Sequence, residues 1–225
     1  MTIKEIYQAL DTIGVLTFST IENMEVHSRV AHLNGFDHDG IYFRTMSNKP
    51  FARQLKANNK LTICGISDSR ILGHDGEGVP DFPPGYFIRM ICEVVYMDEA
   101  EVRQRAQDNP SLQLAVHDLE KYPMMAQGNF RIVKARGEVF DYDFNCQHRD
   151  HKILRERFDF GGMTSNKPGP RITDACIACG QCYEVCSFKA IKKGSVFEVI
   201  SEKCDDCGSC MHICPVDAIE LSHAL

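Results

Sequence analysis

The apolar residues at the start of the chain recur with the spacing of a helix. Four of them lie three or four positions apart: Ile3, Ile6, Tyr7 and Leu10. This period predicts a short amphipathic helix, and Gly14 supplies a typical end. We also expect a helix over residues 51–57 and one or two helices over 99–121, divided into 99–107 and 111–121. Pro110 separates the last two, because proline cannot continue a helix.

Between the helices, runs rich in β-branched and aromatic residues are bounded by turn residues. They predict strands over residues 15–20, 25–33, 40–46, 61–67, 86–96 and 130–142. Residues 34–40 are rich in Asn, Asp and Gly, so we expect a turn there that pairs strand 25–33 with strand 40–46. Together these segments predict an antiparallel barrel with flanking helices, a fold of the α+β class.

Three stretches have the composition of connections. Residues 72–85 are rich in glycine and proline and too many for a tight hairpin, so they form either a binding loop or a solvated connection. Three acid–base groups lie there: His74, Asp75 and Glu77. No partner spacing supports a catalytic role for them, which favours the solvated connection. A charged stretch over 147–157 and a Gly/Pro-rich stretch over 161–170 predict a linker.

The charge balance narrows the choice of partners. The net charge is −6, whereas a general binder of nucleic acid or anionic membranes needs a basic face, so we expect neither partner. Lys4 and Glu5 interrupt the N-terminal apolar residues, so we expect no signal peptide, and no segment is apolar for long enough to span a bilayer. Paired C-x2-C runs without an export signal predict a cytoplasmic protein.

Eight of the eleven cysteines fall in two runs near the C-terminus. Both runs have the spacing C-x2-C-x2-C-x3-C, the first with Cys176, Cys179, Cys182 and Cys186, the second with Cys204, Cys207, Cys210 and Cys214. The runs lie 28 residues apart and align without a gap, which indicates a duplicated half-module. The other cysteines have no ligand spacing, and we expect Cys64 and Cys92 to be buried as small hydrophobic residues.

Three cysteines spaced two apart can wrap one corner of an iron–sulfur cubane, whose fourth ligand comes from a distance. Residues 170–222 resemble bacterial-type 2[4Fe–4S] ferredoxins, in which the fourth cysteine of each run ligates the other cluster. The resemblance implies two [4Fe–4S] ligand sets: Cys176, Cys179, Cys182 with Cys214, and Cys204, Cys207, Cys210 with Cys186. Two structural zinc sites are the alternative. Zinc usually takes two separated C-x2-C pairs, so this spacing favours clusters.

A candidate phosphate site lies where the second predicted helix begins. Ser47 or Asn48 is a suitable N-cap, Pro50 suits the first turn, and Lys49 stands beside them. Free backbone N–H groups and the positive end of the helix dipole favour an anion at such a terminus. The sequence therefore predicts an anion site near residue 49.

Short motifs along the first part of the chain follow one another in a familiar order. Ser28-Arg29-Val30 precedes residues 41–45, then Ser47-x-Lys49 and Gln54. This order resembles the FMN-binding split barrel of the pyridoxamine 5′-phosphate oxidase-like superfamily over about residues 1–145. The resemblance implies a homodimer with FMN near its interface, and FMN contacts from eight residues: Ser28, Arg29, Val30, Arg44, Thr45, Ser47, Lys49 and Gln54. Taken singly, Arg29 and Arg44 are equally well solvated strand residues, and Lys49 an ordinary lysine at a helix start.

The two resemblances predict a split barrel over 1–145, a linker over 146–169 and a ferredoxin domain over 170–225. Because a flavin passes electrons singly or in pairs, its fusion to two clusters suggests an iron–sulfur flavoprotein reductase. We expect a redox partner protein to supply electrons that pass through the clusters to FMN and a small organic acceptor. The alternative is an electron carrier or redox sensor without a substrate. The sequence identifies no catalytic residue, and for His27 and His32 beside the flavin strand a packed or surface role is favoured.

Overall fold

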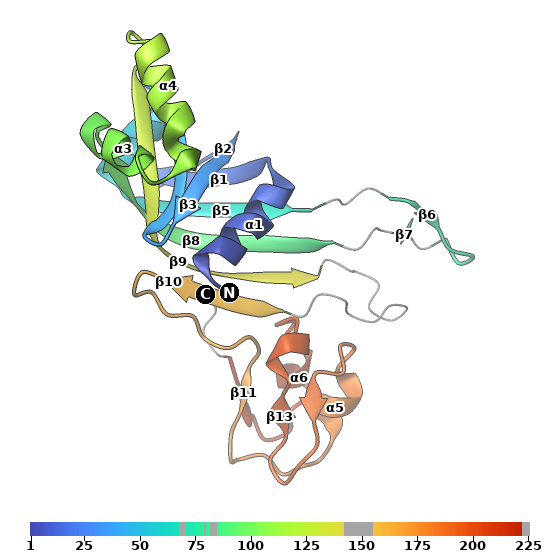
Figure 1. The fold of residues 1–225 in the computed structure, drawn as a ribbon. Helices are drawn as coiled ribbons and strands as arrows, with labels where there is room; N and C mark the ends of the chain where they lie inside the picture. Colours follow the sequence, from blue (N-terminus) through green and yellow to red (C-terminus); the bar gives the residue numbers. More distant parts are fainter. Residues whose placement is uncertain (68–70, 79, 82–84, 142–154, 222–225) are drawn as a thin grey trace. The chain divides into compact units, whose positions relative to one another are not determined.

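The computed structural model of the chain describes residues 1–67, 71–78, 80–81, 85–141 and 155–221. Parts of the predicted loop over 72–85 and of the predicted linker, and the end of the strand predicted over 130–142, lie outside these residues. The chain divides into two compact units. The first comprises Met1–Ser67, Ile88–Gly137 and Phe158–Thr164, and the second comprises Asp68–Phe87, Glu138–Arg157 and Ser165–Leu225 (Figure 1).

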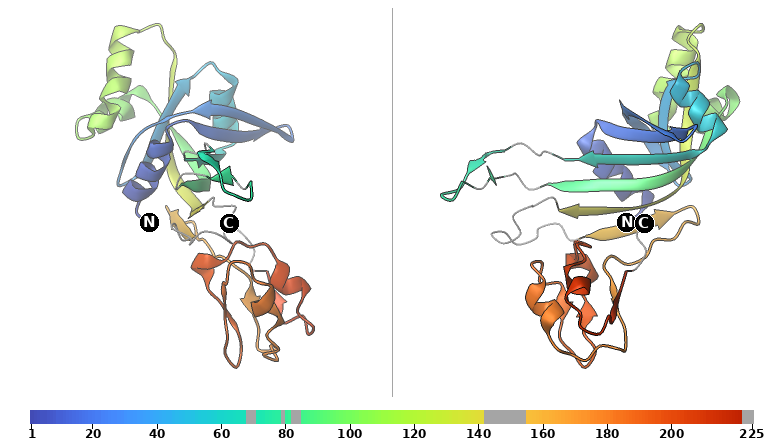
Figure 2. Two further views of the ribbon diagram at one scale, coloured as in Figure 1. Left: turned by 90° about the vertical axis from the view of Figure 1, so that its right-hand side faces the viewer. Right: turned by 180° about the vertical axis from the view of Figure 1, so that it is seen from behind.

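The first unit contains most of one large sheet, which Figure 2 shows from two further sides. The strands run in the order β2-β1-β5-β8-β9-β4-β3, with β10 paired to β9. The strands are β1 Leu16–Glu22, β2 Glu25–Ala31, β3 Leu33–Asp37, β4 Gly40–Met46, β5 Lys60–Ile66, β8 Tyr86–Met97, β9 Gln127–Asp141 and β10 Glu156–Phe160. β1 pairs antiparallel with β2 and β5, and β4 pairs antiparallel with β3 and β9. The predicted α+β class, with an antiparallel sheet and flanking helices, is confirmed.

One predicted strand pairing is wrong. The strand expected over 25–33 pairs with β1, and β4 pairs instead with β3, inside the stretch predicted as a turn. The β3 residues form a strand of the sheet because two of them make packing contacts: Leu33 is buried, and Phe36 packs on Tyr7 with ring centroids 4.9 Å apart. The actual turn is shorter, and the Asp37 carboxylate closes it by accepting from the N–H groups of Asp39 and Gly40.

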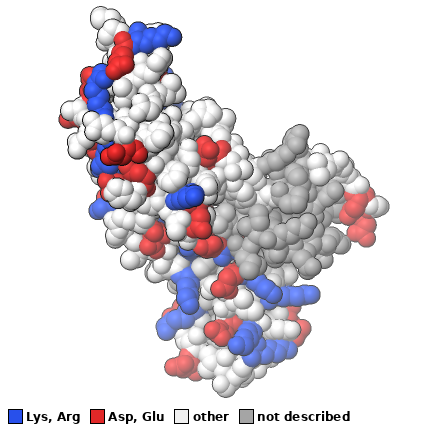
Figure 3. All heavy atoms as spheres, in the orientation of Figure 1, with Lys and Arg blue, Asp and Glu red and all other residues white. Residues whose placement is uncertain are grey.

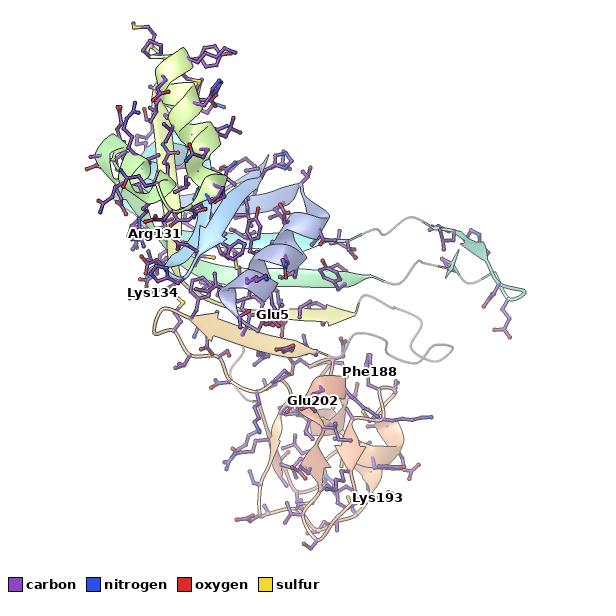
Figure 4. The ribbon with its side chains drawn as sticks, viewed as in Figure 1. Glu5, Arg131, Lys134, Phe188, Lys193 and Glu202 are labelled. Atoms are coloured by element: carbon purple, nitrogen blue, oxygen red, sulfur yellow. The ribbon has the colours of Figure 1, made fainter. Side chains whose placement is uncertain are left out.

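The helices of the first unit follow the predicted segments. Helix α1, Ile3–Ile13, starts with a capping box between Thr2 and Glu5, which Figure 4 labels. It ends at Gly14, where φ is +76°, and packs against β3, β4 and β5. The other helices are α2 Pro50–Ala57, α3 Glu99–Ala106, the 3-10 turn η1 Pro110–Leu112 and α4 Gln113–Lys121. The last three pack around Tyr42 in a separate apolar cluster.

Four phenylalanines from different elements meet in the core of the first unit. Phe43 lies at the centre, with its ring centroid 5.2 Å from Phe18, 5.9 Å from Phe51 and 5.5 Å from Phe130. Cys92 is buried, as predicted, but Cys64 is exposed, so that part of the prediction is wrong. The alternation of β5 places Cys64 on the face opposite Leu61 and Ile63, which are buried.

The second unit contains short strand pairs and two short helices. Its elements are β6 Gly73–His74, β7 Pro80–Asp81, β11 Arg171–Ile172, α5 Gln181–Val185, β12 Ile191–Lys192, β13 Glu198–Val199, η2 Ser201–Lys203, α6 Ser209–His212 and β14 Ile219–Glu220. β6 pairs with β7, β11 with β14, and β12 with β13. The cysteine-bearing half-modules therefore interlock, because the first strand pairs with the last. His74, Asp75 and Glu77 are exposed.

Candidate functional site

A cavity of about 700 Å³ lies in the first unit. Five of the eight residues predicted to contact FMN line it: Arg29, Val30, Arg44, Thr45 and Lys49. Ser28, Ser47 and Gln54 are not among its lining residues. Ser28 instead shares a hydrogen bond with Ser19 across the β1–β2 pair, 2.8 Å between the hydroxyl oxygens. The sheet thus gathers the cationic members of the predicted set around one opening.

Arg29 is held from behind by a buried polar network. Its guanidinium donates to Thr20 Oγ1 and to Gln54 Oε1, both at 2.8 Å, while the Thr20 hydroxyl donates to the same Gln54 oxygen at 2.7 Å. The guanidinium carbon also lies 4.4 Å from the centroid of the Phe51 ring. Gln54 is 2% exposed. Gln54 therefore orients Arg29, which lines the cavity, and is not itself a lining residue.

On another wall of the cavity, Arg44 forms an ion pair that the sequence did not suggest. Arg44 Nη1 lies 2.8 Å from Asp118 Oδ2, and Asp118 also lines the cavity. A hydrogen bond with His117, and then the charge and hydrogen bond of Arg44, hold the pKa of Asp118 below its usual range. Asp118 lies on α4, far from β4 in sequence. No local motif connects the two residues, so only the packing of α4 could reveal the pair.

The start of α2 differs from the prediction in its cap. Lys49 is the N-cap, without a side-chain capping bond, whereas Ser47 or Asn48 was expected. Ser47 lies before the helix, and its backbone N–H donates to the Ala126 carbonyl at 2.8 Å. The Arg53 N–H donates to the Lys49 carbonyl at 3.3 Å, so the N–H groups of Phe51 and Ala52 precede this first helical hydrogen bond, and the helix dipole adds positive potential there. Lys49, Pro50 and Phe51 all line the cavity.

One buried acceptor in the cavity wall lacks a donor. The side-chain oxygen of Asn34 is inaccessible to solvent and has no hydrogen-bond partner among the described residues. Asn34 lines the cavity together with His32 and Gln127. A buried carbonyl oxygen without a donor costs about 1–3 kcal/mol, so an N–H or O–H group of a ligand would be stabilised there.

The second unit has two small cavities, each lined by four of the motif cysteines. Cys176, Cys179, Cys182 and Cys214 line one, and Cys186, Cys204, Cys207 and Cys210 line the other. The surrounding residues include Ile172, Phe197 and Ile219 in the first and Ile191 and Val199 in the second. The described residues contain no group of three or more His, Cys, Asp or Glu side chains that could hold a single metal ion. A cubane instead binds each thiolate to a different iron.

The backbone around the cysteines is repeated in both halves of the module. Ala178 and Asp206 have φ values of +54° and +55° and direct their N–H groups to Cys176 Sγ and Cys204 Sγ, each at 3.4 Å. In the same way, Ala190 and Ala218 donate to Cys186 Sγ and Cys214 Sγ, each at 3.3 Å. These donors suit sulfurs that carry negative charge, as the thiolates of an iron–sulfur cluster do.

The cysteines differ in exposure in a way that also repeats. Cys182 and Cys210 are buried, whereas Cys179 and Cys207 are exposed. Burial is the largest influence on Cys204 and raises the pKa of its thiol to about 11. Such a thiol is protonated near neutral pH, so iron binding must displace its proton.

On the visible face of the C-terminal module, basic and acidic side chains are interspersed (Figure 3). The module also has exposed ion pairs, with Arg171 Nη2 2.7 Å from Glu220 Oε2 and Lys193 Nζ 3.5 Å from Glu184 Oε1. Lys193 also lies 3.9 Å from the centroid of the Tyr183 ring. This face therefore presents charge of both signs.

Comparison with known proteins identifies the C-terminal module. Residues 171–221 match the family model of the 4Fe–4S dicluster domain. A ferredoxin from Butyribacterium methylotrophicum is 52% identical over 29 residues, which are 13% of this chain and 53% of that ferredoxin. The matched segment spans about half the length of this curated relative. The predicted ferredoxin-type module for two [4Fe–4S] clusters is confirmed.

Solved structures similar to this chain were also found. A NimC/NimA family protein from Clostridium acetobutylicum is 18% identical with a TM-score of 0.49, and covers 70% of this chain and 92% of its own. A putative pyridoxamine 5′-phosphate oxidase from Listeria innocua is 12% identical with a TM-score of 0.40, and the match covers 63% of this chain and 98% of that protein. An FAD and heme binding protein from Mycobacterium smegmatis is 11% identical with a TM-score of 0.45, and the match covers 58% of this chain and 65% of that protein. At such low identities, the cavity is interpreted from its own geometry.

In the part of the chain that the structure describes, no helix has the length and apolar character needed to cross a membrane.

Proposed function

We propose that this chain is an iron–sulfur flavoprotein reductase. A redox partner protein supplies low-potential electrons, which reach a small organic acceptor by way of two [4Fe–4S] clusters and one FMN. The observation that carries the proposal is the presence, in one chain, of a dicluster ferredoxin module and of a cavity of about 700 Å³ rich in anion-binding groups. This volume lies within the usual range of cofactor sites, roughly 300–1,000 Å³.

The residues around the cavity fit FMN. Thr45, Lys49 and the start of α2 line the cavity and would hold the phosphate, because a cation and free N–H groups favour an anion there. Arg29, positioned by Gln54, would contact the flavin together with Val30. The unpartnered Asn34 oxygen would accept from a donor of the cofactor. When bound, FMN supplies the exchange between single electrons and a hydride equivalent.

In the ferredoxin module, we propose that each cysteine-lined cavity holds one [4Fe–4S] cluster. The ligand sets are Cys176, Cys179, Cys182 with Cys214, and Cys204, Cys207, Cys210 with Cys186. The repeated N–H donors to sulfur support these sets.

We further propose that the chain forms a homodimer with FMN near its interface. We also propose that the protein is cytoplasmic, since a reducing compartment keeps so many thiols free.

Anaerobic purification with simultaneous quantification of FMN, iron and zinc tests this function. We expect about eight irons and one FMN per chain, with both kinds of centre reducible by a low-potential donor. Visible absorbance follows FMN, and EPR follows the clusters. Zinc in place of iron, or clusters with no affinity for FMN, would contradict the reductase. Bound FMN that reduces no organic acceptor would instead identify an electron carrier or sensor.

Matched lysine variants test the cofactor site itself. Lys49→Ala should weaken FMN binding by about tenfold, equivalent to about 1.4 kcal/mol, because it removes the cation nearest the proposed phosphate. Lys4→Ala is the control, since Lys4 is exposed on α1 and does not line the cavity. Fluorescence titration with FMN and with riboflavin separates the phosphate contribution, because only FMN should lose affinity. Equal losses for both ligands would contradict a phosphate contact at Lys49.

A further inference from the structure

A cluster of four charged side chains lies next to one of the cysteine-lined cavities. We call Glu138, Arg155, Arg157 and Asp206 the Arg155 network. The side chains of Glu138, Arg157 and Arg155 are 0%, 4% and 7% exposed. Glu138 accepts from Arg155 Nε at 3.0 Å and Nη2 at 3.1 Å, and from Arg157 Nε at 3.2 Å. Charges this deeply buried require close partners, because their desolvation is costly.

The network is joined directly to Cys204. Arg155 Nη1 donates to the Cys204 carbonyl oxygen at 2.7 Å and lies 3.1 Å from Asp206 Oδ2. The Arg155 N–H also donates to the carbonyl of Glu202, which Figure 4 labels, at 2.9 Å. Glu138 occupies the Nε and Nη2 edge of the guanidinium, whereas Nη1 is directed to Cys204. The positive charge of Arg155 is therefore closer to this ligand than the negative charge of Glu138.

Asp206 connects the network to the turn around Cys204. Its backbone N–H donates to Cys204 Sγ at 3.4 Å, and its Oδ1 accepts from the N–H of Gly169 at 2.7 Å. Its Oδ2 lies 3.2 Å from Arg157 Nη2, whose neighbouring Nη1 donates to the Asn166 carbonyl at 2.8 Å. Arg155 thus contacts Cys204 directly, whereas Arg157 is linked to Cys204 through Asp206.

The first half of the module lacks this carboxylate at the equivalent position. Ala178 stands 28 residues before Asp206, with nearly the same φ and the same N–H to sulfur distance. The two halves therefore share backbone geometry at this turn but differ in charge. Arg155, Arg157 and Glu138 lie outside the duplicated segment, so the duplication gives them no counterpart beside Cys176.

We propose that the Arg155 network sets the reduction potential of the cluster at Cys204 separately from that of the cluster at Cys176. Reduction of a cluster adds one electron from the external donor and changes no covalent bond, so the cluster becomes more negative. A nearby guanidinium stabilises the reduced form and a nearby carboxylate destabilises it, most strongly where water is excluded. Arg155 therefore raises this potential and Asp206 lowers it. The proposal rests on the ligand sets proposed above and does not depend on FMN.

Paired variants at the two equivalent turns test the proposal. In Asp206→Ala the second turn acquires the side chain of the first, and in Ala178→Asp the first turn acquires a carboxylate without guanidinium partners. Anaerobic potentiometric titration of the full chain, followed by EPR, should resolve two one-electron steps. Asp206→Ala should raise the potential of one step by at least about 59 mV, which corresponds to a tenfold change in the equilibrium constant of a one-electron reduction. Ala178→Asp should lower the other step.

A double variant tests Arg155 without leaving a buried charge unpaired. Arg155→Gln with Glu138→Gln removes the guanidinium and its distal partner together. The double variant should lower the potential of the step that Asp206→Ala raises. Arg155→Lys, which keeps the positive charge, should leave that potential close to the wild-type value. Iron content checks that both clusters are present in each variant.

Three outcomes would overturn the proposal. The first is that Asp206→Ala and the double variant leave both steps unchanged at full iron content. The second is that each of these variants moves both steps equally, and the third is that Asp206→Ala and Ala178→Asp move the same step. A wild-type chain with no iron would refute the ligand sets themselves, which is a failure of the proposed function and not of the network alone.

Discussion

The two candidate sites of this chain are assembled in different ways. In the ferredoxin module, each cysteine run lies in one short segment, and local turns direct backbone N–H groups to the sulfurs at 3.3–3.4 Å. In the first unit, the cavity takes residues from β2, β4, α2 and α4, which only the packed sheet brings together. Its arginines are held by side chains: Arg29 by Gln54, and Arg44 by Asp118.

This difference shows how each site should respond to substitution. A site made of local turns depends on its ligand atoms, so loss of one ligand removes a whole centre. A site held by packed side chains has many supports, so loss of one support should change stability or affinity by a limited amount. Four substitutions, ordered by expected effect, test this contrast.

The largest effect is expected from removal of a cluster ligand. Cys207→Ser should lower iron from about eight to about four atoms per chain, because a hydroxyl is a poor substitute for a thiolate in a cubane. Iron analysis and visible absorbance after anaerobic reconstitution measure the loss. Cys64→Ser is the control, since Cys64 is exposed and outside both cysteine runs. Full iron content in Cys207→Ser would refute the ligand assignment.

The Arg155 network is an exception in the second unit, because side chains from outside the ferredoxin module hold the turn at Cys204. Arg155→Ala removes the guanidinium that donates twice to the buried Glu138 carboxylate and should cost about 3–5 kcal/mol of unfolding free energy. Anaerobic denaturation at matched iron content should show a midpoint at lower denaturant concentration. Arg171→Ala breaks the exposed pair with Glu220 and should leave the midpoint unchanged. Equal midpoints for both variants would mean that burial does not distinguish the two arginines.

In the first unit, Gln54→Ala should have an intermediate effect. It leaves Thr20 and Arg29 without the amide oxygen that accepts from both, which costs about 1–3 kcal/mol. The same change should weaken FMN binding, because Arg29 loses its fixed orientation. Thermal unfolding and FMN titration measure the two effects. Gln8→Ala, at a position on α1 outside the cavity, is the control. Unchanged stability would show that Gln54 does not support Arg29.

The smallest effect is expected at Asp118. Asp118→Asn removes the charge that competes for Arg44, and should tighten FMN binding by about twofold to threefold. The pKa of Asp118 is below its usual range, so the ion pair is present at neutral pH and is lost only as the pH falls into the acidic range. The wild type should therefore approach the variant in affinity at acidic pH. Asp108→Asn, exposed and outside the cavity, is the control. Weaker binding in Asp118→Asn would assign the carboxylate a direct contact with the ligand.

Local patterns predicted most elements of the fold, and their failures have specific causes. The period of α1 and its end at Gly14 were predictable, because helix period and capping are local. The pairing of β4 with β3 was not, because Leu33 and Phe36 join the sheet through tertiary packing. The exposure of Cys64 was also missed, since alternation decides the exposed face of β5 and apolar composition does not.

The sequence by itself determined the ferredoxin module, because covalent spacing places each cysteine run around one small volume. Its resemblance to the split-barrel superfamily also predicted that Arg29, Arg44 and Lys49 belong to one site, and all three line one cavity. Only the tertiary structure paired Arg44 with Asp118, placed Gln54 behind Arg29 and joined the Arg155 network to Cys204. These contacts link residues distant in sequence and depend on side-chain packing, which no local spacing encodes.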